Sequence, residues 1–145
     1  NPNAKGSHGE IGLYQITPIC LKHFNQSNHG KDKGFYRFSG TDIFGNSNMH
    51  YIDDFIMDDM KFPAYAEQVA NWYMNWLFDR CWTVKDTLIA WNWGIGRWRK
   101  WKNEALCSIT KGDSEVGITH GCYRDLPKTT QAYLKKYEKL TGEKL

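Results

Sequence analysis

Apolar residues recur at helical spacing over long stretches of this chain, and this periodicity is the feature that most constrains its fold. The clearest stripe follows Pro63 and is formed by Ala66, Val69, Ala70, Tyr73, Trp76 and Leu77. A second stripe lies within 128–141, stops at Gly142 and is formed by Tyr133, Leu134, Tyr137 and Leu140. Each stripe occupies one face of a helix, so both segments should be amphipathic. The sequence therefore predicts a mainly α fold.

Caps and spacing predict four more helices. Thr17 is a suitable N-cap for a helix over 18–26, and Thr83 begins a helix that ends near Gly94. A short helix is expected over 96–103. The fourth helix should cover 48–60, with an apolar face of Ile52, Phe55, Ile56 and Met60 and an opposite face of Asp53, Asp54, Asp58 and Asp59.

The segments between these helices are less regular. Residues 1–16 are predicted to form a loop, because glycines punctuate them. Residues 27–47 are rich in Gly, Ser, Asn and Lys and are predicted to be an irregular insertion. One short β-hairpin is expected within 104–125, where Thr110-Lys111-Gly112-Asp113 resembles a turn. About six helices would then make up the chain.

Length and charge exclude several classes of protein. The 145 residues suffice for one domain with one core. No run of about 18 apolar residues occurs, so no transmembrane segment is expected. The net charge of +3 is too small to argue for DNA binding but suits an anionic polymer. Aromatic residues make up 15% of the chain, more than a core needs, which indicates a groove lined by rings.

The cysteines lie at positions 20, 81, 107 and 122. Two interpretations stay open: Cys107 pairs with Cys122, or all of them are reduced, with Cys20 and Cys81 packed as small apolar groups. No C-x-x-C pair, zinc-finger spacing or H-E-x-x-H motif occurs. The aspartates of 48–60 lack the Gly and Glu pattern of a calcium loop. No metal site is therefore expected.

Three stretches are more specific than the composition. The first runs from Gly9 to Pro18 and is a glycine-shaped turn that delivers Tyr14 and Gln15 just before a capped helix. The second, 90–96, places two tryptophans and an asparagine at a helix end. The third, 126–133, is a proline-led helix start. Taken singly, each has an ordinary structural explanation, so their joint order and spacing carry the functional interpretation.

In that order the stretches resemble the catalytic domain of the soluble lytic transglycosylases, which has a lysozyme-like fold. The family shows the blocks E-S-x-x-N-P-N-A, G-A-x-G-L-x-Q-I-x-P, A-Y-N-A-G-x-G and P-x-E-T-x-x-Y-V. The matches to the first two blocks are Asn1-Pro2-Asn3-Ala4 and then Gly9, Gly12, Leu13, Gln15, Ile16 and Pro18. The matches to the last two are Ala90, Asn92, Gly94 and Gly96, then Pro127, Thr130 and Tyr133. The resemblance thus spans nearly the whole chain, apart from 27–47 and 104–125.

The resemblance implies a peptidoglycan lytic transglycosylase. Such an enzyme cleaves the β-1,4 bond between N-acetylmuramic acid and N-acetylglucosamine with a single glutamate, assisted by the substrate acetamide, and yields a 1,6-anhydro product. No cofactor is implied. The catalytic glutamate of the family would lie four residues before Asn1, so 1–145 is expected to be one lysozyme-like domain that lacks its N-terminal helix. Within the chain, Glu10 is the fallback acid.

The resemblance also implies which residues bind the glycan strand. These candidates are Tyr14, Gln15, Trp91, Asn92, Trp93 and Tyr133. Gln15 and Asn92 offer amides to sugar groups, whereas the aromatic rings offer stacking surfaces. Three departures from the family pattern are Trp91 in place of Tyr, Thr129 in place of Glu, and Glu10 in place of a small residue.

Two other functions compete with the enzyme. A catalytically inactive peptidoglycan-binding module of the same fold fits the Trp91 and Thr129 departures. A single-strand nucleic-acid binder could use the basic and aromatic residues, but it explains none of the three motifs. The preferred hypothesis predicts a monomer that binds glycan strands and no nucleic acid, in the periplasm, outside the cell or on a phage particle.

Overall fold

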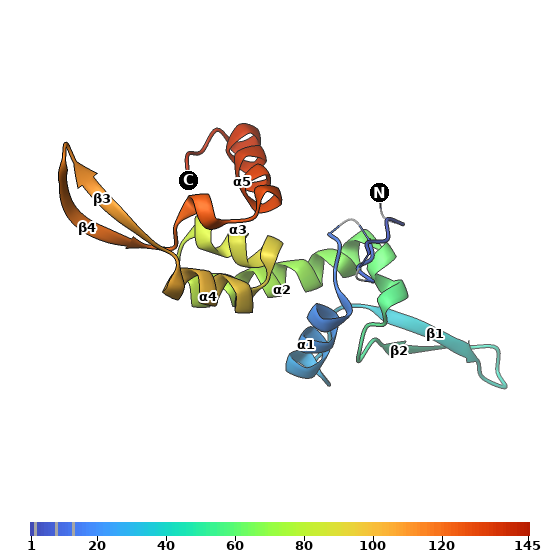
Figure 1. Cartoon of the computed structure of the whole chain (residues 1–145). Coiled ribbons are helices and arrows are strands. Elements are labelled where there is room, and N and C mark those ends of the chain that lie inside the picture. Colours follow the sequence, from blue (N-terminus) through green and yellow to red (C-terminus); the bar gives the residue numbers. More distant parts are fainter. Residues whose placement is uncertain (2, 8, 13) are drawn as a thin grey trace. The chain divides into compact units, whose positions relative to one another are not determined.

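A computed structural model describes residues 1, 3–7, 9–12 and 14–145 of the chain. Its helices are α1 (Pro18–Asn28), α2 (Pro63–Cys81), α3 (Val84–Trp93), α4 (Ile95–Glu104) and α5 (Lys128–Thr141), with short 3-10 helices η1 (Met57–Lys61) and η2 (Tyr123–Asp125) (Figure 1). The strands are β1 (Tyr36–Thr41), β2 (Ser47–Tyr51), β3 (Leu106–Lys111) and β4 (Ser114–His120). The described part is therefore helical with two antiparallel hairpins, β1–β2 and β3–β4.

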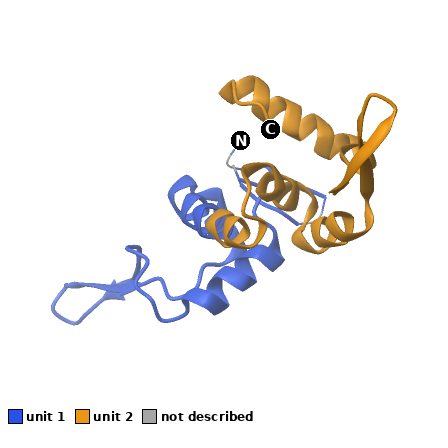
Figure 2. Cartoon of the chain, turned by 90° about the vertical axis from the view of Figure 1, so that its left-hand side faces the viewer, with its two compact units in different colours: residues 1–73 blue, residues 74–145 orange. Residues whose placement is uncertain are grey.

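The chain forms two compact units, shown in blue and orange in Figure 2. The first unit is Asn1–Tyr73 and the second is Met74–Leu145, so the boundary falls inside α2. Each unit is described by itself.

The core of the first unit is aromatic. Thr17 caps α1 as predicted, because its hydroxyl accepts a hydrogen bond from the Cys20 amide at 3.1 Å. Phe24 on α1 stacks on Phe55 with ring centroids 5.7 Å apart, and Tyr65 of α2 stacks on the same ring at 5.3 Å. Burial of these rings fixes the segment that follows β2 against both helices.

The prediction of a helix over 48–60 is wrong. Residues of this segment instead form most of β2, an extended stretch and η1. β2 pairs with β1, which lies inside the segment 27–47 that was predicted to be an irregular insertion. The apolar positions are satisfied without a helix, since Ile52, Phe55 and Met60 are buried whereas Ile56 is 57% exposed. Asp59 is buried rather than solvated, and its carboxylate accepts hydrogen bonds from the Arg37 guanidinium and the Ile56 amide.

The second unit matches its predicted elements closely. Thr83 caps α3 by accepting from the Asp86 amide at 3.1 Å, and α4 and α5 lie where spacing placed them. The hairpin expected within 104–125 is confirmed as β3–β4, which pairs from Leu106 opposite His120 to Lys111 opposite Ser114. The tryptophans of α4, Trp98 and Trp101, are buried as in an amphipathic helix.

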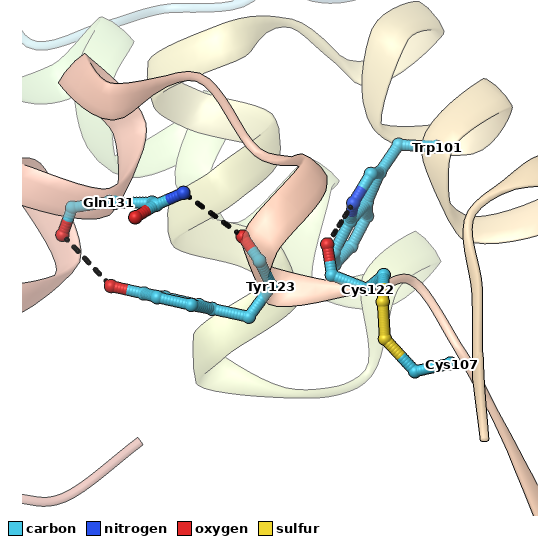
Figure 3. Close-up of a disulfide and its surroundings, with 5 residues drawn as sticks. All are labelled: Trp101, Cys107, Cys122, Tyr123 and Gln131. Carbon is cyan, nitrogen blue, oxygen red and sulfur yellow. Dashed lines mark hydrogen bonds between the residues drawn. A yellow bond between two sulfur atoms is a disulfide. The ribbon is translucent and has the colours of Figure 1, made fainter.

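A disulfide joins Cys107 to Cys122 and ties the base of β3–β4 to the start of η2 (Figure 3). The indole N–H of Trp101 donates to the Cys122 carbonyl at 2.8 Å. The pairing left open by the sequence is thus confirmed, and Cys20 and Cys81 are free and buried. Burial raises the pKa of the Cys20 thiol to about 12 and that of Cys81 to about 11, so both stay protonated.

Candidate functional site

The predicted site residues divide between the two units. Glu10, Tyr14 and Gln15 lie in the loop before α1, in the first unit. The others, Trp91, Asn92, Trp93 and Tyr133, lie on α3 and α5, in the second. Two motif positions, Pro2 and Leu13, lie outside the described residues.

The loop before α1 is held by its own backbone. Ile11 and Ile16 exchange hydrogen bonds at 3.0 and 3.1 Å, and the Gly12 amide donates to the Ala4 carbonyl at 3.0 Å. Gly12 has φ +91°, and a Cβ built there would lie 2.0 Å from the Met60 carbonyl oxygen. Both the backbone angle and the close approach require glycine, which gives this motif position a physical cause.

Gln15 combines a strained backbone with a fixed side chain. Its φ of +51° is in the left-handed region, which costs a residue with a Cβ about 1 kcal/mol or more. The side-chain amide nitrogen donates to the Gly12 carbonyl at 2.7 Å and lies 3.4 Å from the Ala4 carbonyl. The exposed side chain is thereby oriented, with its nitrogen turned to the loop and its oxygen away from these two carbonyls.

Glu10 and Tyr14 flank this arrangement, and both are half-buried. The carboxyl group of Glu10 lies over Gly6, since a Cβ built on Gly6 would meet the Glu10 Cδ at 2.1 Å. Glu10 therefore sits in the glycine turn, folded back on its own loop, rather than on a helix end. This placement does not favour Glu10 as the general acid.

In the second unit the third and fourth motif blocks meet. The buried Thr130 hydroxyl of α5 donates to the side-chain oxygen of Asn92, on α3, at 2.9 Å. Gly94 has φ +100°, ends α3 by donating its amide to the Ala90 carbonyl at 2.8 Å, and starts α4. Thr130 thus orients Asn92, and Gly94 makes the sharp join between the helices possible.

The aromatic candidates of this unit are half-buried: Trp91, Trp93 and Tyr133. Burial raises the pKa of Tyr133, and the neighbouring Tyr137 raises it further, so its hydroxyl is a hydrogen-bond donor at neutral pH. A Cβ built on Gly96 would meet no heavy atom of the described residues within 4 Å. The backbone here is open to the approach of a ligand, and no packing contact explains the glycine.

The basic residues of α4 are not equivalent. Arg97, Arg99 and Lys100 are exposed. Lys102 instead donates to the buried carboxylate of Asp86 at 2.8 Å, which joins α4 to α3. Among the basic residues of α4, Arg97, Arg99 and Lys100 are therefore better placed than Lys102 to attract an anionic ligand.

One group of side chains in the described part of the chain comes close enough to hold a metal: His29, Asp53 and Asp54, with ligand atoms within 4.8 Å of one another. The imidazole lies between the carboxylates, with Nδ1 3.2 Å from Asp54 and Nε2 3.9 Å from Asp53. The hydrogen bond that the imidazole makes to the Asp54 carboxylate, together with the charges of Asp53 and Asp54, raises the pKa of His29. The contacts of one imidazole with two carboxylates explain this geometry without a metal ion.

Comparisons of the chain with models of protein families, with curated proteins and with solved structures gave no match. None of the helices that the structure describes is both long and apolar enough to cross a membrane.

Sequence reasoning missed the partners that fix the site. Thr130 was identified only as a motif match, and its bond to Asn92 joins residues 38 apart in the chain. The cluster of His29 with Asp53 and Asp54 was also missed, because the aspartates fitted the solvated face of a predicted helix. His29 gave no clear signal in the sequence, since it lies three residues after the expected end of the helix over 18–26.

Proposed function

We propose that the chain is the larger part of a peptidoglycan lytic transglycosylase with a lysozyme-like fold. The observation that supports this most is the meeting of two motif blocks in the Thr130–Asn92 hydrogen bond. The positive φ angles of Gly12 and Gly94 add to it, because both motif glycines stand where only glycine is unstrained.

In this proposal the general acid is a glutamate four positions before Asn1. It protonates the leaving oxygen, the substrate acetamide stabilises the sugar cation, and the muramoyl 6-hydroxyl replaces water. Gln15 offers its oriented side-chain oxygen to an acetamide N–H, and Asn92 offers its amide. Tyr133 donates its hydroxyl, and Trp91 with Trp93 present ring faces to the sugars.

The test is to express the chain with the residues that precede Asn1 in its gene and to digest purified sacculi. Mass spectrometry should find 1,6-anhydromuropeptides, and Gln in place of the upstream glutamate should abolish them. Asn92→Ala should lower the rate by about tenfold or more while Thr130→Val lowers it less, because Thr130 only positions Asn92. Reducing-end products alone would make the protein a hydrolase, and no products would reject catalysis.

The alternative is a catalytically inactive peptidoglycan-binding module of the same fold. The departures at Trp91 and Thr129 favour it, since a phenol and a carboxylate of the family pattern are replaced. It predicts that the 145-residue chain sediments with sacculi and leaves their turbidity unchanged. Absence of cosedimentation would exclude this module.

A further inference from the structure

A groove of about 540 Å³ runs along α1 within the first unit. One wall is a single face of α1, with Pro18, Lys22 and Asn25 at helical spacing, and His29 continues this wall just past the helix end. The other wall is the segment 54–57, which follows β2 and ends at the first residue of η1. The volume is in the range of sites for small ligands and short peptides.

The two walls are fixed to each other and run in opposite directions. The side-chain nitrogen of Asn25 donates to the Phe55 carbonyl at 2.8 Å, and its oxygen accepts from the Phe55 amide at 3.0 Å. Four residues after Asn25, the imidazole of His29 contacts the Asp54 carboxylate at 3.2 Å. Because Asn25 occupies both backbone groups of Phe55, a ligand cannot add as a strand there and must be recognised by side chains.

The groove has charge of opposite sign at two places. Lys22 lies on α1 two helical turns before His29, a separation of about 10 Å along the axis. The end at His29 carries the carboxylates of Asp53 and Asp54. The buried Lys33 ammonium donates to the Asp53 backbone carbonyl, and its positive charge offsets one of the two negative charges. This end keeps one net negative charge when His29 is neutral.

The middle of the groove is apolar. Leu21 and Phe55 are buried beneath it, and Ile56, 57% exposed, borders it with Met57. The Phe55 ring is only 2% exposed, so it cannot serve as a stacking platform for a sugar. A glycan is therefore a poor fit, and a chain with separated charges and small apolar side groups is a good one.

We propose that this groove binds the stem peptide of peptidoglycan, with its free ammonium at Asp54 and its terminal carboxylate at Lys22. This inference rests on the proposed function, which makes peptidoglycan the substrate. Three extended residues span about 10 Å, which matches the separation of the charges. Alanyl methyl groups then lie against Ile56 and Met57.

The test is an NMR titration of the full 145-residue chain with a synthetic stem peptide that has a free side-chain ammonium and a free terminal carboxylate. Amide signals of 18–29 and 54–57 should shift. Lys22→Met should weaken binding by up to about fivefold, the scale of one exposed ion pair, and should leave binding of the C-terminally amidated peptide unchanged. Asp54→Asn should weaken binding of the peptide with the free ammonium to a similar extent. It should leave binding of the peptide with an acetylated side-chain nitrogen unchanged.

The matched control is Lys139→Met, an exposed lysine of α5 outside the groove, which should change neither titration. Lys22→Met could instead weaken binding of the C-terminally free and amidated peptides equally. That result would show that Lys22 does not pair with the terminal carboxylate and would overturn the inference. Shifts confined to other segments, or none, would overturn it as well.

The failure of this inference differs from the failure of the proposed function. If the extended protein forms 1,6-anhydro products but the stem peptide does not bind in the groove, only the inference falls. If the peptide binds with the expected charge pattern and no anhydro product forms, the groove is a stem-peptide site and the catalytic proposal falls.

Discussion

The two hairpins of this chain are secured by different means. The base of β3–β4 is closed by the Cys107–Cys122 disulfide, next to the Trp101 indole hydrogen bond. The β1–β2 hairpin contains no cysteine and is held by polar contacts, which include the Arg37–Asp59 ion pair. A covalent restraint acts on the unfolded chain as well, whereas polar contacts act only in the folded state. The two hairpins should therefore respond differently to reduction, packing changes and pH.

Removing the disulfide should have the largest effect. Cys107→Ala with Cys122→Ala opens a loop of 15 residues, and we expect a loss of about 3 kcal/mol in the unfolding free energy of the second unit. Hydrogen exchange should then accelerate in β3 and β4 and stay unchanged in β1 and β2. Dithiothreitol should reproduce the effect in the wild type and have none in the double variant. Equal acceleration in both hairpins would contradict the comparison.

Two glycines allow the stability cost of backbone strain to be measured apart from the cost of a packing clash. Gly121, at the base of β3–β4, has φ +80°, and a Cβ there would lie 2.6 Å from the Trp101 ring. Gly45, in the β1–β2 turn, has φ +78°, and no heavy atom of the described chain lies within 4 Å of its Cβ position. Gly121→Ala should cost about 2–3 kcal/mol, and Gly45→Ala about 1 kcal/mol, in denaturant titrations. Equal costs would mean that Trp101 moves aside freely.

The Arg37–Asp59 pair is the corresponding weak point of β1–β2. Arg37→Met leaves the buried Asp59 carboxylate with the Ile56 amide but without its cation. We expect a loss of about 1–2 kcal/mol, less than for a fully buried pair, because the Arg37 side chain is half-exposed. Exchange should accelerate in β1 and β2 only. An unchanged β1–β2 would show that its turn, rather than this pair, secures it.

The comparison also explains which parts of the fold could be predicted. The β3–β4 hairpin has a local signal in its turn at Gly112, and α3 and α5 have local caps and stripes. The prediction of a helix over 48–60 is wrong because the structure of this segment depends on distant residues. Asn25 binds Phe55 across 30 positions of the chain, and Arg37 binds Asp59 across 22. Local periodicity cannot reveal such contacts. Apolar residues at helical spacing therefore occur here in a segment that is extended.

The candidate site divides in the same way. Gly12 and Gly94 were found from the motifs, and the structure adds why each must be glycine. The groove along α1 had no sequence signal, because the Asn25–Phe55 contact that joins its walls depends on the tertiary fold.

The smallest effect concerns the β1–β2 turn and its pH dependence. The Asn46 amide, with that of Phe44, donates to the Asp42 carboxylate at 2.9 Å, which lowers the pKa of Asp42 below its ordinary value of 3.8. A lowered folded-state pKa means that this stabilisation is complete above the unfolded value and is lost as pH falls through the folded value. An NMR titration should place the Asp42 pKa below 3.8, and exchange of the Asn46 amide should accelerate beneath it.

Asp42→Asn is the matched control for this turn. Its side-chain oxygen still accepts the turn amides but does not titrate in this range, so the acid-induced acceleration at Asn46 should disappear. The β3–β4 hairpin should keep its protection over the same pH interval, because its disulfide does not titrate. Parallel loss of protection in both hairpins would show that acid loosens the chain generally. The proposed contrast between a covalently closed hairpin and one held by polar contacts would then fail.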